Sequence, residues 1–130
     1  DAGPGAVRIV SVATGLELDE IHSVVGNSGS GTTVASLPDQ DGDGRKDLLV
    51  GAPTELGLGA AHVVSSLSGS IGLTVRGQAP NCQFGRALCA AGDVDADGVS
   101  DFAVTSVYDG DPLRVFSGVD GQTLWTRPAE

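Results

Sequence analysis

The sequence predicts an all-β protein built from repeated four-stranded units, and three observations favour this fold class. Glycine accounts for 20 of the 130 residues, roughly twice the usual 7% share. Short apolar runs alternate with polar turns, and no segment keeps a helical period over ten residues or more. Two aspartate-rich loops of one pattern lie 54 residues apart, which indicates an internal repeat. Together these features are typical of a turn-rich β-repeat protein.

The repeat extends beyond the aspartate loops. A shift of 54 residues aligns 47–50 (DLLV) with 101–104 (DFAV). A strand–turn–strand element occurs three times, and its serines Ser11, Ser65 and Ser117 are 54 and 52 residues apart. Three copies at nearly constant spacing indicate tandem units of one architecture.

Each unit is expected to hold four short strands, because runs of Val, Leu, Ile and Ala are bounded by Gly, Asp, Pro or Ser. The aspartate loop joins the first strand to the second. The expected strands are 32–37, 48–51, 61–66 and 73–76 in the middle unit, and 86–91, 102–105, 113–117 and 123–126 in the last. Units of about fifty residues have the size of a four-stranded antiparallel β-propeller blade.

The chain is therefore expected to hold about two and a half blades. Residues 1–25 supply the last two strands of a preceding blade. Residues 26–77 form a blade with the first aspartate loop, and residues 78–130 form a blade with the second.

The two loops read D-x-D-x-D-G-x-x-D and hold eight of the thirteen aspartates. Four carboxylates within nine residues repel one another unless a cation lies among them. Glycine at the sixth position lets the backbone turn sharply enough to wrap oxygen atoms around that cation. The pattern predicts one hard-cation site per loop. Ca²⁺ is favoured over Mg²⁺, which retains its waters and rarely accepts an all-protein cage.

On these motifs the chain resembles the FG-GAP repeats of integrin α-subunit propellers and their bacterial relatives. The family name refers to a Phe-Gly pair before the calcium loop and a Gly-Ala-Pro segment after it. The middle repeat keeps Gly-Ala-Pro at 51–53 but has Ser-Gly at 30–31. The last repeat keeps Phe-Gly at 84–85 but has Thr-Ser-Val at 105–107. The resemblance covers nearly the whole chain and implies a β-propeller with Ca²⁺ in these loops.

The resemblance also implies the ligands of two Ca²⁺ ions. Each loop would supply four carboxylates and one backbone carbonyl, with water completing the shell. The expected ligands are Asp39, Asp41, Asp43, Asp47 and the carbonyl of Arg45 in the first loop, and Asp93, Asp95, Asp97, Asp101 and the carbonyl of Val99 in the second.

Other interpretations of the loops fit less well. An EF-hand needs a bidentate Glu at position twelve, where this chain has Val50 and Val104. Dockerin modules place helices after similar loops and repeat at a shorter spacing. Asx turns without metal remain an alternative, although turns alone do not need two copies of the complete ligand pattern.

The composition limits the possible partners. A formal net charge of −10 disfavours nucleic acid and anionic membranes. No apolar run approaches transmembrane length, so membrane insertion is not expected. The sequence lacks methionine, and we expect a processed protein or an excised segment.

No catalytic residues are expected, because the sequence contains no G-x-S-x-G elbow, P-loop or dinucleotide fingerprint. His22 and His62 lack a carboxylate or cysteine at ligand spacing and are expected to be ordinary strand or loop histidines. Cys82 and Cys89 fit neither a redox pair nor a zinc cluster. A local disulfide is the favoured alternative for them, and two free buried thiols the other. Trp125 is expected to pack on an outer strand.

The sequence therefore indicates a non-catalytic, calcium-binding propeller segment of a secreted or cell-surface protein, in an extracellular or periplasmic compartment. The resemblance implies a wider role in adhesion or in recognition of a protein or glycan. Expected partners are calcium and either the rest of a longer propeller or further copies of the chain. One alternative is a self-assembling fragment, in which two chains pair their half blades to give about five blades. Another is a non-catalytic part of a larger extracellular enzyme.

Overall fold

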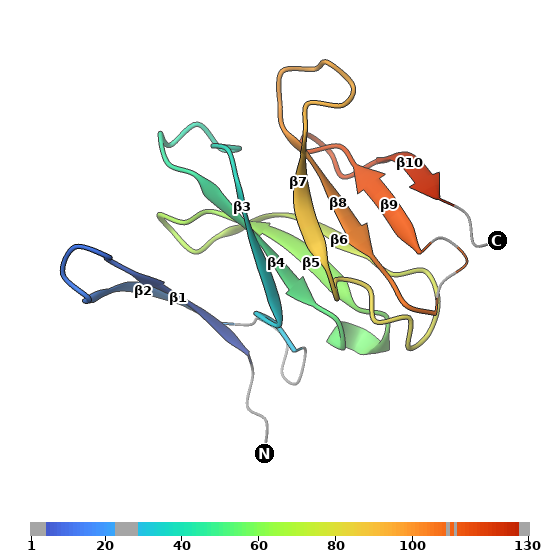
Figure 1. Ribbon diagram of the computed structural model, residues 1–130, viewed down its shortest axis with the longest axis horizontal. Helices are drawn as coiled ribbons and strands as arrows, with labels where there is room; N and C mark the ends of the chain where they lie inside the picture. The colour runs from blue at the N-terminus through green and yellow to red at the C-terminus, as the bar shows by residue number, and fades with distance from the viewer. Residues whose placement is uncertain (1–4, 23–28, 109, 111, 128–130) are drawn as a thin grey trace.

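The computed structural model describes residues 5–22, 29–108, 110 and 112–127. Within these residues ten strands form three antiparallel sheets, and one short 3₁₀ turn, η1 (Glu55–Gly57), follows β4 (Figure 1). The strands are β1 (Ala6–Val10), β2 (Glu17–His22), β3 (Thr33–Leu37), β4 (Asp47–Ala52), β5 (Ala60–Val64), β6 (Ile71–Arg76), β7 (Leu88–Gly92), β8 (Asp101–Thr105), β9 (Leu113–Phe116) and β10 (Thr123–Arg127). The predicted all-β fold class is confirmed.

Strand order follows the chain in every sheet. β1 and β2 form a hairpin, β3 to β6 form a four-stranded sheet, and β7 to β10 form another. These antiparallel four-stranded sheets are consistent with propeller blades, and we call them the middle blade and the last blade. The predicted strand ends differ from the observed ones by two residues at most, as expected where strands fray.

The three sheets extend over 6–22, 33–76 and 88–127. The predicted boundary at residue 25 lies outside the described residues, so the division into 1–25, 26–77 and 78–130 stays a prediction. No helix among the described residues is long and apolar enough to span a bilayer.

The main core lies between the middle and last blades. The middle blade contributes apolar side chains such as Leu49 and Val63, and the last blade contributes three phenylalanines. Phe84 meets Phe116 edge to face, with ring centroids 5.7 Å apart, and Phe102 stacks on Phe116 at the same distance. Such aromatic pairs stabilise a core beyond the area they bury.

A second apolar cluster joins the first hairpin to the opposite face of the middle blade. Val7, Ile9 and Ile21 of the hairpin pack against Val50 and Val64. The middle blade is therefore covered on both faces, and the three sheets succeed one another in chain order across the molecule (Figure 1).

Two motif glycines meet at the junction of the middle and last blades. A Cβ atom on Gly51, the glycine of Gly-Ala-Pro, would lie closer than 3.0 Å to Thr33 Oγ1 and to the carbonyl oxygen of Gly85. Gly85 belongs to Phe-Gly, has φ +94°, and accepts a hydrogen bond of 2.7 Å from Thr33 Oγ1. The Phe-Gly of one repeat thus docks against the Gly-Ala-Pro of the repeat before it, where only glycine allows the approach.

This contact predicts that Gly51→Ala destabilises the fold. The added Cβ meets Gly85 and Thr33 inside van der Waals distance, and overpacking of this kind costs about 1–3 kcal/mol. Gly72→Ala in β6 is the matched control, because its Cβ would meet only the Val63 carbonyl oxygen, at 3.9 Å. Urea unfolding of both variants tests the contact, and an equal effect at the two positions would contradict it.

Candidate metal centres

Both aspartate loops join the first strand of a blade to the second. The first connects β3 to β4 and the second connects β7 to β8. Each loop ends on an aspartate that begins the second strand, Asp47 and Asp101, and these two side chains are 1% and 0% exposed. The last carboxylate of each loop is therefore fixed by the sheet, while Asp39, Asp41, Asp93 and Asp95 lie on the exposed loop.

Carboxylate oxygens accept backbone amides within the first loop. Asp39 accepts hydrogen bonds from the amides of Gly42 at 2.6 Å and Gly44 at 2.8 Å. Asp41 accepts from the amide of Asp43 at 3.0 Å. Asp43 in turn accepts from the amide of Arg45, at 2.7 Å. These bonds fold the loop back over its own carboxylates, so the charged groups converge.

The second loop repeats most of this pattern. Asp93 accepts from Gly98 at 2.8 Å, as Asp39 does from Gly44. Asp97 accepts from Val99 at 2.8 Å, and its own amide donates to Asp93 and Asp95. The two loops are therefore structural as well as sequence repeats.

The structure brings most of the predicted carboxylate ligands together. Among the described residues, carboxylate oxygens within 4.8 Å of one another come from two groups, which are Asp39, Asp41 and Asp43 in the first loop and Asp93, Asp95 and Asp101 in the second. Asp47 and Asp97 lie outside these groups. Arg45 and Val99, predicted as carbonyl ligands, turn their amides toward Asp43 and Asp97. Oxygen-only donor sets of this kind suit a hard cation.

The two buried aspartates differ in how their oxygens are satisfied. Asp101 accepts Val94 N at 2.7 Å through Oδ2 and Gly118 N at 2.9 Å through Oδ1. Asp47 accepts Gln40 N at 2.6 Å through Oδ2. Its Oδ1 atom makes no hydrogen bond of normal geometry to any described residue. A buried, unpaired carboxylate oxygen is costly, and a cation bound by the first loop would satisfy it.

The pKa values report the same crowding. Burial raises the pKa of Asp47, and the charges of Asp41 and Asp43 act in the same direction, whereas the amides of Gln40 and Ser66 oppose them. Both charge repulsion and burial therefore disfavour the ionised form of Asp47 when no metal is present.

Two exposed aspartates shift in opposite directions. The Gly44 amide lowers the pKa of Asp39, with the Gly42 amide acting in the same direction. Loss of hydration raises the pKa of Asp95, and the charges of Asp97, Asp101 and Asp93 add to the effect. Hydrogen bonds from loop amides therefore favour the ionised form of Asp39, whereas lost hydration and neighbouring charges disfavour the ionised form of Asp95.

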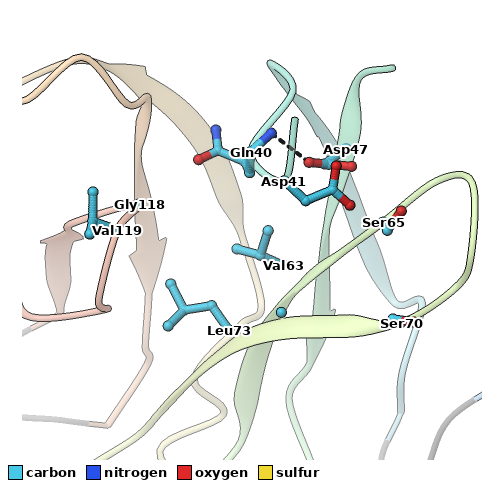
Figure 2. A pocket seen from close by; sticks show the side chains of 10 residues that line it. Gln40, Asp41, Asp47, Val63, Ser65, Ser70, Leu73, Gly118 and Val119 are labelled. Carbon is cyan, nitrogen blue, oxygen red and sulfur yellow. Dashed lines mark hydrogen bonds between the residues drawn. The ribbon is translucent and has the colours of Figure 1, made fainter. Parts of the chain in front are cut away.

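A pocket of about 370 Å³ opens beside the first loop, between the middle and last blades. Figure 2 shows Asp41, Asp47 and Gln40 on one side, Val63 and Leu73 below, and Gly118 and Val119 across the junction. Both amide atoms of Gln40 are buried without a hydrogen-bond partner among the described residues. The equivalent residue of the second loop is Val94, which is 54% exposed. The Gln40 amide is suited to hold ordered water at the blade junction.

Residues outside the nine-residue motif also contact the carboxylates. Ser65 Oγ donates to Asp43 Oδ2 at 3.3 Å, and Gly118 N donates to Asp101 Oδ1. Both follow the third strand of their blade. The regular spacing of Ser65 and Ser117 marks this position in the sequence, but nothing there links it to the loops.

The structure contains a buried polar network that was not predicted from the sequence. Glu55, 1% exposed, lies between His62 Nε2 at 2.7 Å and Arg76 Nη1 at 2.6 Å. The other ring nitrogen of His62 pairs with Thr74 Oγ1 at 2.8 Å. The network fastens η1 to β5 and β6. His62 is a strand histidine as predicted, but it has a carboxylate partner seven residues earlier. The side chain of His22 lies outside the described residues.

The disulfide predicted between Cys82 and Cys89 is absent, and both thiols are free. Cys82 is buried in the core, and its Sγ donates to the carbonyl of Leu58 at 3.0 Å. Cys89 lies in β7, is exposed, and pairs in register with Ala103 on the face of the last blade that points away from this core. The alternative of two buried thiols is therefore right for Cys82 and wrong for Cys89.

Asp47 and Asp101 differ in the hydrogen bonds that their buried carboxylates accept, so we expect an Asp→Asn substitution to have opposite effects on stability at the two positions. In metal-free buffer at neutral pH, Asp47→Asn is expected to raise the melting temperature, because it removes an unpaired buried charge. Asp101→Asn is expected to lower stability by about 1–2 kcal/mol, because it breaks one of two accepted amide bonds. Thermal unfolding in chelator measures both, and equal losses would contradict the assignment.

The pH dependence of Asp47 has a definite sign. Its folded pKa is raised above 3.8, so its stabilising contribution is present below pH 3.8 and is lost as the pH rises through the raised value. Asp47→Asn should remove this component from the metal-free stability profile.

Ala96 provides a second test of loop geometry. It has φ +62°, where its repeat equivalent Gly42 has φ +83°. Ala96→Gly is expected to raise the free energy of unfolding by about 1 kcal/mol, and Gly42→Ala to lower it by a similar amount. A Cβ on Gly42 would meet nothing within 4 Å, so the effect isolates backbone strain. Urea unfolding gives the two signs, and effects of the same sign would contradict the equivalence.

Comparisons with known proteins agree with these features. The profile of the FG-GAP repeat family matches residues 30–64, which contain the first aspartate loop and the Gly-Ala-Pro segment. The chain is 33% identical to integrin alpha-IIb of Homo sapiens over 114 residues, which cover 73% of this chain. It is 38% identical to integrin alpha-7 of Mus musculus over 94 residues, or 65% of this chain.

The matched region spans 11% of the length of integrin alpha-IIb and 8% of integrin alpha-7. The likeness therefore concerns a small part of each relative. In this chain, each four-stranded antiparallel sheet has an aspartate loop between its first two strands. The profile match, the two integrin relatives and this architecture show that the chain belongs to the integrin-like FG-GAP repeat family.

Proposed function

We propose that the chain is a non-catalytic segment of an integrin-like β-propeller that binds one structural Ca²⁺ ion in each aspartate loop. The observation that carries the proposal is the convergence of three carboxylates in each loop, within 4.8 Å of one another. In the first loop, the buried Oδ1 atom of Asp47 also makes no hydrogen bond of normal geometry to a described residue. A cation in the first loop would satisfy this oxygen and cancel the repulsion between the carboxylates.

The donor chemistry favours Ca²⁺ over other metals. The converging groups are carboxylates, and Ca²⁺ takes six to eight oxygen ligands in flexible geometry. Asp39, Asp41, Asp43 and Asp47 would hold one ion with the Arg45 carbonyl. Asp93, Asp95, Asp97 and Asp101 would hold the other with the Val99 carbonyl.

The role of the metal would be to order the loops. Each loop spans the first two strands of a blade, and Ser65 and Gly118 tie the carboxylates to the end of the third strand. An ion that binds only the folded loop stabilises the blade by mass action. Extracellular calcium modules typically bind at about 10⁻⁴–10⁻³ M, so the proposed site suits an extracellular or cell-surface location.

The wider role follows from the resemblance to integrin α-subunits. A propeller segment of this kind would contribute to adhesion, or to recognition of a protein or glycan, as part of a longer polypeptide. The remaining blades and the ligand would belong to the whole protein.

The side chains of Thr74, His62 and Glu55 follow the hydroxyl, imidazole and carboxylate order of a catalytic triad. Thr74 pairs with His62, and His62 pairs with Glu55. His62 is only 5% exposed, and Glu55 is also paired to Arg76. The network is enclosed between η1, β5 and β6, which suits a structural role and supports the assignment of a non-catalytic chain.

Calcium titration of loop variants tests the proposal. The melting temperature of the parent chain is expected to be about 5–10 °C higher in saturating Ca²⁺ than in chelator. Asp41→Ala and Asp95→Ala should each remove part of this rise, and the double variant should remove all of it. Mg²⁺ at the same concentration should give a smaller shift.

The matched control is Asp120→Ala. Asp120 lies in the exposed turn before β10, where its Oδ1 accepts Gln122 N at 2.9 Å. This variant should retain the full calcium response. Equal melting temperatures of the parent chain in chelator and in Ca²⁺ would contradict the proposed function.

A further inference from the structure

The pocket between the middle and last blades contains polar atoms that no described residue satisfies, and we call it the junction pocket. Both amide atoms of Gln40, Oε1 and Nε2, are buried there without a hydrogen-bond partner among the described residues. Together they offer two N–H donors and one acceptor oxygen. Because unpaired polar groups are costly to bury, a polar partner is expected to lie beside them.

Gln40 is held in place from both sides of the junction. Its backbone N–H donates to Asp47 Oδ2 at 2.6 Å, which ties it to the start of β4. Its side chain reaches the last blade, because a Cβ atom on Gly118 would lie 3.0 Å from Gln40 Oε1. Figure 2 shows the Gln40 side chain above Val63 and Leu73 and between the aspartates and Gly118. The pocket walls therefore come from two four-stranded blades whose junction lies inside the chain.

The other polar groups of the junction pocket favour a neutral ligand that donates hydrogen bonds. Asp41 and Asp47 contribute carboxylates to its wall, and Ser70 contributes a hydroxyl. The four carboxylates of the first loop exceed the charge of one Ca²⁺ ion, so the surroundings stay acidic and disfavour a carboxylate, phosphate or sulfate. A carboxylate also has about four acceptor positions, so Asp41 can bind a metal and still accept from a ligand.

The apolar lining limits the shape of the ligand. Val63 and Leu73 form the floor, and Val119 lies at the rim. Val63 is 6% exposed and Val119 is 59% exposed, so the pocket has a buried floor and an accessible mouth. No aromatic side chain lines the described pocket, which disfavours nucleobases and other flat aromatic ligands. Its volume of about 370 Å³ lies in the range of small-molecule sites.

Hydroxyl groups match this lining better than a peptide amide does. A single amide would pair with the Gln40 side chain and leave Asp41 and Ser70 unmatched. Several hydroxyls on one ring can meet all three, because each hydroxyl both donates and accepts. The C–H groups of the ring would then cover Val63 and Leu73.

We propose that the junction pocket binds a neutral sugar ring, as the end residue of a glycan. Two neighbouring hydroxyls would pair with Gln40, one accepting from Nε2 and one donating to Oε1, and a third would donate to Asp41. The ring would displace water held by the Gln40 amide, and it reproduces the hydrogen bonds of that water. The inference rests on the proposed function, because glycan recognition is one of its wider roles and Ca²⁺ would order Asp41.

NMR titration of the full chain in millimolar Ca²⁺ tests the pocket. The probes are the methyl glycosides of glucose, galactose and mannose. At least one should shift the side-chain amide resonances of Gln40, with a dissociation constant on the order of 1 mM because one ring buries little surface. Methyl glucuronide, which is anionic, should bind more weakly. No shift with any neutral glycoside at about 50 mM, far above that constant, would overturn the proposal. Binding of acetyl-glycinamide in place of the glycosides would do the same and would assign the pocket to a peptide.

Gln40→Leu removes the amide and nearly keeps the side-chain size. It should weaken glycoside binding at least about tenfold, since two hydrogen bonds are lost. It should melt no lower than the parent chain, because it deletes two unpaired buried atoms, so unfolding would not account for the lost affinity. Gln78→Leu is the matched control, since Gln78 is exposed and follows the end of β6 opposite Ser70. Equal affinities of the two variants would contradict the pocket assignment.

Melting temperatures of the same parent sample in chelator and in Ca²⁺ separate this inference from the proposed function. A calcium response without glycoside binding would overturn the sugar pocket alone. Glycoside binding by a chain that shows no calcium response would overturn the metal role alone.

Discussion

The burial of one aspartate at the start of the second strand of each blade is the constraint on which the loops depend. Asp47 and Asp101 belong to the sheet and to the acidic loop at once, so the strand fixes where the carboxylates converge. The last blade satisfies its buried aspartate with two amides, whereas the middle blade leaves one oxygen of Asp47 unpaired. If the loops bind cations as we propose, this asymmetry predicts that the first loop gains more from its ion than the second.

Blade stacking explains the divided family motif. Gly51 of Gly-Ala-Pro and Gly85 of Phe-Gly meet at the one junction between two complete blades in the described chain. The halves of the motif that this chain retains are therefore the halves that contact each other. In the last blade, Thr105 occupies the position equivalent to Gly51. Packing between the two blades thus explains why one repeat keeps Gly-Ala-Pro and the next keeps Phe-Gly.

The sequence was sufficient to predict the strands and the loops because both depend on local signals. Alternating apolar runs and turn residues set the strand positions, and the 54-residue shift set the repeat. The Glu55–His62–Arg76 network was not predictable, because it joins side chains from a 3₁₀ turn and two strands that only the fold brings together. The predicted disulfide between Cys82 and Cys89 was wrong for the same reason. A short separation along the chain does not place two side chains on the same face of a sheet. The unpaired oxygen of Asp47 is likewise a property of packing.

Anomalous diffraction from crystals grown in millimolar calcium tests the central claim most directly. The data are recorded at a wavelength where calcium scatters anomalously. The account predicts one anomalous peak in each loop, surrounded by carboxylate oxygens at about 2.3–2.6 Å, with Asp47 Oδ1 among the ligands of the first. Loops without anomalous peaks, and an Asp47 Oδ1 atom that is bonded to a protein amide or to water instead, would contradict it.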